Sequence, residues 1–198
     1  MNLRFSKPDQ SAIDALLLKQ GDRDLSYAMV GCTQEITAHQ NCHSGFTRDH
    51  NRIQLGQGQA CFQRAKQAIQ KWEMFNLGWV QITDTSTPIE PGSLACVRVN
   101  LFGLWSLNVC RIVYLLNEPT PTGSRYGFGY GTLPHHAEQG EERFTIEWNS
   151  EDGSVWYDIL AFSRPANWLT WTFNPAIRRF QKKFALDSKQ AMLQDVSS

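Results

Sequence analysis

The sequence has no excess of charge of either sign, since 19 Lys and Arg residues balance 19 Asp and Glu residues in a chain of 198. A nucleic-acid-binding protein normally carries a basic excess or stripe that neutralises phosphates, so we predict no nucleic-acid partner. The same balance argues against tight electrostatic attachment to an anionic membrane. Charge therefore points to an ordinary globular protein.

Long apolar runs are also missing. The longest, at 109–116, contains Arg111 and is far shorter than the roughly 20 residues of a membrane span, so we predict no transmembrane segment. Residues 1–8 lack the apolar region of a signal peptide. The five cysteines are widely spaced and form no CxxC pair. These absences predict a cytoplasmic protein with reduced thiols.

Common catalytic and cofactor motifs are absent as well. The sequence has no G-x-S-x-G, and no Lys-Ser/Thr follows the glycine-rich stretch 123–131, which therefore is not a phosphate loop. His39, Cys42 and His43 lie close together, but in a polar, loop-like stretch without a second pair of ligands. We predict no metal site and no cofactor.

Aromatic residues, by contrast, are plentiful: 12% of the chain, including seven Trp and eleven Phe. Cys61, Ala65, Ala68 and Trp72 recur at helical spacing and predict a helix that begins near residue 59. A short helix, capped by Ser6, is expected to end at Gly21.

Most of the remaining chain reads as short strands. Turn residues such as Pro91-Gly92 and Asp152-Gly153 separate successive strands, which predicts an antiparallel sheet, and no βαβ alternation occurs. The polar stretch 34–51 is expected to be a loop. The predicted strands cover 25–33, 52–56, 79–82, 94–101, 107–116, 126–131, 142–148 and 155–162.

A long helix is expected after Pro165, with a kink or break near Pro175. Its apolar seam consists of Leu169, Phe173, Ile177, Phe180 and Phe184. The fold class that follows is α+β, a curved antiparallel sheet wrapped around a long C-terminal helix. We expect one domain over 1–198, with 1–24 as N-terminal helix and lead-in and 194–198 as a frayed tail.

Several long blocks resemble the family called domain of unknown function 1990, notably "YGFGYGTLPHHAEQGEERFTIEW" and "VWYDILAFSRPANWL". The blocks "YAMVGCT", "LGQGQACFQRAKQAIQKWEMF" and "CRIVYLLNEP" precede them in the same order, so the resemblance covers about 27–192. It implies a START-like, helix-grip fold around an apolar pocket, and no established activity. The chain departs from the family pattern at His135, Ala137 and Gln139.

The densest group of ionisable residues lies at 135–143. His136 beside Glu141 or Glu142 has the composition of a general acid/base site. The same residues can instead decorate a surface turn, with either glutamate paired to Arg143 or Arg125. If Phe144 faces the core, alternation turns Glu142 inward and Arg143 outward.

Three functions remain open. The first is binding of a small hydrophobic or aromatic ligand between the sheet and the last helix, with Arg164 available for an anionic head group. The second is an enzyme that uses His136 with Glu141 or Glu142 on a lipophilic substrate, and the third is protein interaction through Trp168 and Trp171. Oligomeric state stays undecided. The residues expected to line the pocket are Tyr126, Phe128, Tyr130, Phe144, Trp156 and Phe173.

Overall fold

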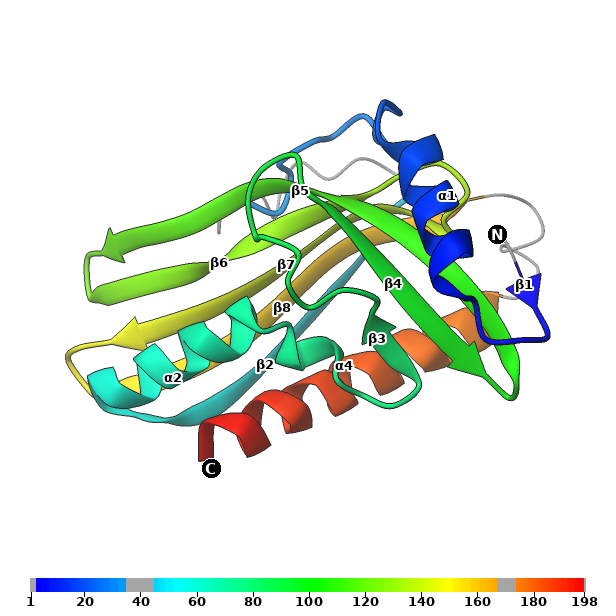
Figure 1. Ribbon diagram of the computed structural model, residues 1–198. Helices are drawn as coiled ribbons and strands as arrows, with labels where there is room; N and C mark the ends of the chain where they lie inside the picture. Colours follow the sequence, from blue (N-terminus) through cyan, green and yellow to red (C-terminus); the bar gives the residue numbers. More distant parts are fainter. Residues whose placement is uncertain (1–2, 35–44, 167–173, 198) are drawn as a thin grey trace.

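The computed structural model describes residues 3–34, 45–166 and 174–197 (Figure 1). The strands are β1 (Leu3–Arg4), β2 (Thr47–Gln57), β3 (Val80–Ile82), β4 (Leu94–Leu101), β5 (Leu104–Thr120), β6 (Gly123–Thr132), β7 (Glu138–Asn149) and β8 (Ser154–Pro165). The helices are α1 (Gln10–Gln20), α2 (Gly58–Gln70), the 3₁₀ turn η2 (Glu73–Phe75) and α4 (Asn174–Ser197).

All strands belong to one curved antiparallel sheet in the order β2-β8-β7-β6-β5-β4-β3, and β1 pairs with β5 outside that row. Helices α2 and α4 lie on the same side of the sheet, in contact with each other, while α1 packs against β4 and β5 (Figure 1). The α+β prediction of a curved sheet that holds a long C-terminal helix is confirmed.

Helix α4 does not fill the concave face alone. Helix α2 packs on β6, β7 and β8 and shares that face. Trp72 adopts a left-handed conformation, with φ of 62°, directly after α2, and this turns the chain into η2. Phe75 then enters the core, where its ring centroid lies 5.4 Å from those of Phe144 and Phe184. The main core is therefore aromatic and is built between two helices and the sheet.

A second, smaller core lies on the opposite face of β4 and β5. Ile13 of α1 packs there with Cys96, Leu107, Val109 and Leu133. The side chain of Asp9, not Ser6, caps α1 by accepting a 2.9 Å hydrogen bond from the backbone nitrogen of Ala12. The predicted helix is present, and its cap lies three residues later than expected.

Two segments differ from the sequence expectation. Residues 25–33 form turns and bends rather than a strand, because their backbone and side chains bind groups on the outer face of the sheet. The last five residues of the expected loop 34–51 belong to β2, which begins at Thr47 and pairs with β8. Its polar composition hid an edge strand, whose pairing depends on a partner more than 100 residues away in sequence.

The end of the chain is also more ordered than predicted. Helix α4 continues to Ser197, and Val196 is buried in the main core. Arg64 of α2 donates a 2.9 Å hydrogen bond to the carbonyl of Val196. Residues 194–197 are therefore held by α2 rather than frayed. Pro175 lies in the first turn of α4, where a proline is tolerated.

The glycines of β6 allow close packing by two side chains. A Cβ atom on Gly129 would lie 2.3 Å from the Tyr114 ring, and one on Gly131 would lie 2.2 Å from the Tyr27 hydroxyl. Two tyrosines thus approach the outer face of β6. Helices occupy only its inner face at this point.

Candidate functional site

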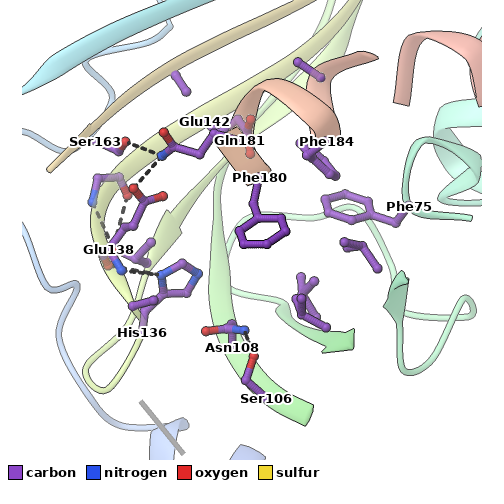
Figure 2. Close-up of a pocket in the computed structure, with 18 of the residues that line it drawn as sticks. Phe75, Ser106, Asn108, His136, Glu138, Glu142, Ser163, Phe180, Gln181 and Phe184 are labelled. Carbon is purple, nitrogen blue, oxygen red and sulfur yellow. Dashed lines mark hydrogen bonds between the residues drawn. The ribbon is translucent and has the colours of Figure 1, made fainter. Parts of the chain in front are cut away.

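A pocket of about 570 Å³ lies between the concave face of the sheet and the first half of α4. Residues from β2, β4, β5, β6, β7, β8, η2 and α4 line it, so it is a product of the whole fold (Figure 2). Leu3, Phe102 and Leu104 border it as exposed apolar side chains, which places its mouth beside the β4–β5 turn.

One side of the pocket is apolar. Phe75, Phe180 and Phe184 lie together on this side (Figure 2). Val97 and Val99 of β4 add aliphatic surface. The helical spacing of Phe180 and Phe184 places both on the face of α4 that looks toward the sheet. This side of the pocket can accommodate the apolar body of a small molecule.

The opposite side is polar and begins with an ion pair between α4 and the edge strand β2. Arg178 binds both carboxylate oxygens of Asp49, one of them at 2.7 Å. Arg178 also donates to the side-chain oxygen of Gln181 at 2.7 Å. Gln181 in turn donates to Glu138, and at 3.2 Å to Ser163. Helix α4 is thereby fixed to β2, β7 and β8 at the pocket wall.

Glu142 projects into the pocket from β7. The hydroxyl of Tyr130 donates to its carboxylate at 2.9 Å, and the described residues give it no cation. Burial raises the pKa of Glu142 to about 7, although the Tyr130 hydrogen bond acts in the opposite direction. Burial also raises the pKa of Glu138, against the hydrogen bond from Gln181. Both carboxyl groups therefore hold a proton more readily than an exposed glutamate does.

His136 lines the pocket from the turn that precedes β7. His136 Nδ1 lies 3.0 Å from the backbone nitrogen and 3.1 Å from the carbonyl oxygen of Glu138. Burial lowers the pKa of His136 to about 4. At neutral pH this side chain is an uncharged imidazole within a polar wall. His135 precedes it with a φ of 71° and is exposed.

Glu141 lies on the other side of the sheet from Glu142. Its carboxylate accepts hydrogen bonds from Tyr27 Oη at 2.6 Å, from the Gly31 nitrogen at 2.7 Å and from Thr33, whose nitrogen and hydroxyl lie at 2.9 and 2.5 Å. Four donors hold this group, which ties residues 27–33 to the outer face. The structure therefore does not bring Glu141 together with His136.

Arg143 also points to the outer face, as alternation predicts, yet it is buried there. It donates to Asp158 at 2.9 Å and to the carbonyl of Thr33 at 2.9 Å. Asp158 also contacts His50 Nε2 at 2.5 Å. The segment that covers this network was predicted as a strand, and for that reason the burial of Arg143 could not be anticipated.

Among the aromatic residues expected to line the pocket, Tyr130 does so. Tyr126, Phe128 and Phe144 point to the same concave face but are packed in the main core. Phe128 lies 5.1 Å from Trp72, centroid to centroid, because α2 and η2 fill this part of the face. The periodicity of β6 predicts which face of the sheet a side chain occupies, but not whether a helix covers that side chain.

The other expected residues lie elsewhere. Trp156 is on the outer face, where the Arg52 guanidinium lies 4.9 Å from its ring. Arg164 is exposed, donates to Gln139 at 3.0 Å and lies 4.7 Å from the Phe46 ring, away from the pocket. Phe173 lies outside the described residues, as do Trp168 and Trp171.

The sequence analysis missed Asp49, Gln181 and Asn108. Asn108 of β5 lines the pocket at 7% exposure, and its amide nitrogen donates to Ser106 at 3.2 Å. Its Oδ1 atom has no hydrogen-bond partner among the described residues. The polar Asn108 within the apolar strand "LWSLNVC" was an available signal, since an internal strand position seldom holds an unpaired amide.

Within 3–34, 45–166 and 174–197, no group of three His, Cys, Asp or Glu side chains is placed to hold a metal ion. No helix in these ranges is both long and apolar enough to cross a membrane.

Comparison with known proteins gives a family without an assigned activity. The family model described as domain of unknown function (DUF1990) matches residues 26–191. A UPF0548 protein of Dictyostelium discoideum is 36% identical over 206 residues, which cover 98% of this chain and 95% of the relative. A UPF0548 protein of Arabidopsis thaliana is 34% identical over 156 residues, with 78% of this chain and 75% of the relative covered.

Solved structures show only distant similarity. The crystal structure of Ara h 8.0201 matches with a TM-score of 0.47 and 12% identity, over 76% of this chain and 99% of that chain. The crystal structure of human STARD10 matches with a TM-score of 0.42 and 10% identity, over 96% of this chain and 81% of that chain.

Proposed function

Since the chain belongs to the DUF1990 family, whose description assigns no activity, we propose a function from the pocket itself: the protein binds a small, largely hydrophobic molecule between its sheet and helix α4. The observation that carries this proposal is the pocket volume of about 570 Å³. Ligand pockets typically measure ~300–1,000 Å³ and combine apolar walls with a few polar groups. The pocket has this composition.

Blocking variants test this proposal. Ala185 lines the pocket from α4, and Ala185→Phe places a ring in the space for a ligand. The neighbouring Leu186 is 59% exposed, so Leu186→Phe adds a ring to the same helix outside the pocket. Val99→Phe on β4 blocks the pocket from the opposite wall and guards against a folding defect of the first variant.

The purified protein is extracted with organic solvent and analysed by native mass spectrometry. We expect a hydrophobic compound in the wild type and in Leu186→Phe, and at least tenfold less of it in Ala185→Phe and Val99→Phe at equal folded yield. Equal amounts of the compound in all four proteins, or none in the wild type together with no binding of added hydrophobic probes, would contradict the proposal.

A second candidate function is an enzyme, favoured by the raised pKa of Glu142 inside the pocket. We propose Glu142 as its general acid or base, with His136, which lines the same pocket, as a neutral hydrogen-bonding group. Glu141 has no part in this alternative, because its carboxylate lies on the outer face. If the extracted compound is a substrate, Glu142→Gln retains it and prevents its conversion to product, as measured by chromatography.

We propose that the protein is cytoplasmic, and its buried cysteines support this location. Cys61, Cys96 and Cys110 are buried as thiols, and burial raises the pKa of each. Such protonated, buried thiols suit the reducing cytoplasm.

A further inference from the structure

The polar end of the pocket has more hydrogen-bond acceptors than donors. The Tyr130 hydroxyl and the Gln181 amide, the donors nearest the two pocket glutamates, are already used by Glu142 and Glu138. Glu142 receives no other hydrogen bond from the described residues. A carboxylate can accept about four hydrogen bonds, so most of its capacity remains open toward the pocket.

Asn108 gives an independent observation of the same kind. Its side chain lines the pocket at 7% exposure, and its Oδ1 atom is buried without a hydrogen-bond partner among the described residues (Figure 2). A buried acceptor without a partner costs roughly 1–3 kcal/mol. Asn108 therefore adds an unsatisfied acceptor, and no positive charge, to the polar end of the pocket.

The charged groups around the polar end of the pocket also favour a cationic ligand. Asp49 forms an ion pair with Arg178, whose two terminal nitrogens both donate to that carboxylate. Glu138 and Glu142 have no ion-pair partner among the described residues. Lys182 also borders the pocket, but as an exposed side chain on α4. The polar end of the pocket thus holds the carboxyl groups of Asp49, Glu138 and Glu142 against the guanidinium of Arg178, whose charge also lowers the pKa of Glu138.

We propose, as a refinement that rests on the proposed function, that the ligand is a lipophilic amine. Its protonated nitrogen lies against Glu142 and Glu138, while its apolar body packs on Phe75, Phe180 and Phe184. An ammonium group supplies up to three donors and one positive charge, which matches the open acceptors and the charge of this wall. An anionic head group would meet two carboxyl groups and is disfavoured.

Three probes with the same ten-carbon chain separate the contribution of the head group from that of the apolar body. Decylamine, decanol and decanoate are titrated into the intact protein at pH 8, below their micelle-forming concentrations, by isothermal calorimetry. At this pH the amine is protonated and Glu142, with a pKa of about 7, is largely ionised. We expect decylamine to bind about tenfold or more tightly than decanol, and decanoate to bind most weakly.

Glu142→Gln should remove most of this preference and leave decanol binding unchanged, because Gln retains the shape and the Tyr130 contact but not the charge. Glu147→Gln is the matched control: it lies on the same strand but pairs with Arg52 at 2.8 Å outside the pocket. Decylamine affinity in this control should equal that of the wild type. Ala185→Phe should weaken all three probes, which shows that they bind in the pocket.

The outcomes separate the two proposals. If all three probes bind in the pocket but decanol or decanoate binds as tightly as decylamine, the amine proposal is overturned and the proposed function stands. If none of the probes binds, or if Ala185→Phe leaves their binding unchanged, both proposals fail. An amine preference that persists undiminished in Glu142→Gln would also overturn the assignment of the head group to this wall.

Discussion

Glu141 and Glu142 are neighbours on β7 with the same chemistry and opposite surroundings. Glu141 faces outward and accepts four hydrogen bonds from Tyr27, Gly31 and Thr33. Glu142 faces the pocket, accepts one from Tyr130 and has its pKa raised to about 7. A carboxylate whose acceptor capacity is filled by the protein holds the fold together, whereas one with open capacity is available to a ligand or a proton.

The same contrast extends across the two faces of the sheet. On the outer face, Arg143 bridges Asp158 and the carbonyl of Thr33, so these charges are paired within the protein, although Arg143 Nε and Thr145 Oγ1 have no partner among the described residues. On the inner face, Glu142 and Asn108 retain acceptors without partners. We therefore assign stability to the outer network and ligand recognition to the inner one.

Glu141→Gln is the largest expected perturbation. The amide presents donor hydrogens to Thr33 and Tyr27, which are donors themselves, and leaves buried polar groups unsatisfied. We expect a loss of about 3 kcal/mol or more in the free energy of unfolding, measured by urea denaturation. Glu147→Gln, on the same face with a half-buried ion pair to Arg52, should cost less than about 1 kcal/mol. Equal losses would remove the distinction between these two outer glutamates.

Glu142→Gln tests the contrast between the two glutamates through the pH dependence of stability. A carboxyl group with a raised pKa is protonated more readily in the folded than in the unfolded state. Its contribution to stability is complete below about pH 4.5 and is lost as pH rises through about 7. Wild type should lose on the order of 1–3 kcal/mol relative to Glu142→Gln between pH 4.5 and pH 8, as urea denaturation at both pH values would show. Parallel pH profiles would mean that Glu142 is solvated like an ordinary surface glutamate.

His136 gives the smallest effect at neutral pH, where its ring is already uncharged. Burial lowers its pKa to about 4, so it favours the folded state above about pH 6.5, and this contribution is lost as pH falls through about 4. Nitrogen-15 spectra should show a neutral ring down to about pH 5. His136→Gln identifies the signal by its disappearance. A midpoint near 6.5 would place His136 in open solvent rather than in the pocket wall.

Short-range sequence periodicity was sufficient to predict the elements whose pattern lies within their own residues. The stripe of Cys61, Ala65 and Ala68 predicted α2, and alternation in β7 predicted that Glu142 and Arg143 point to opposite faces. The same local logic failed at β2, because an edge strand of polar residues is defined by pairing with β8 and not by its own hydrophobicity. It failed again at 25–33, where long-range hydrogen bonds to Glu141 override strand propensity.

The sequence by itself determined the order of the elements, the antiparallel sheet and the side of β7 on which each glutamate lies, because these depend on short-range periodicity. Only the tertiary structure decided which inward residues meet a helix and which meet a pocket. Phe144 and Glu142 share one face of one strand, yet η2 covers the first with Phe75 and leaves the second open. Burial is a property of the neighbours that folding brings to a residue, and those neighbours lie far away in the chain.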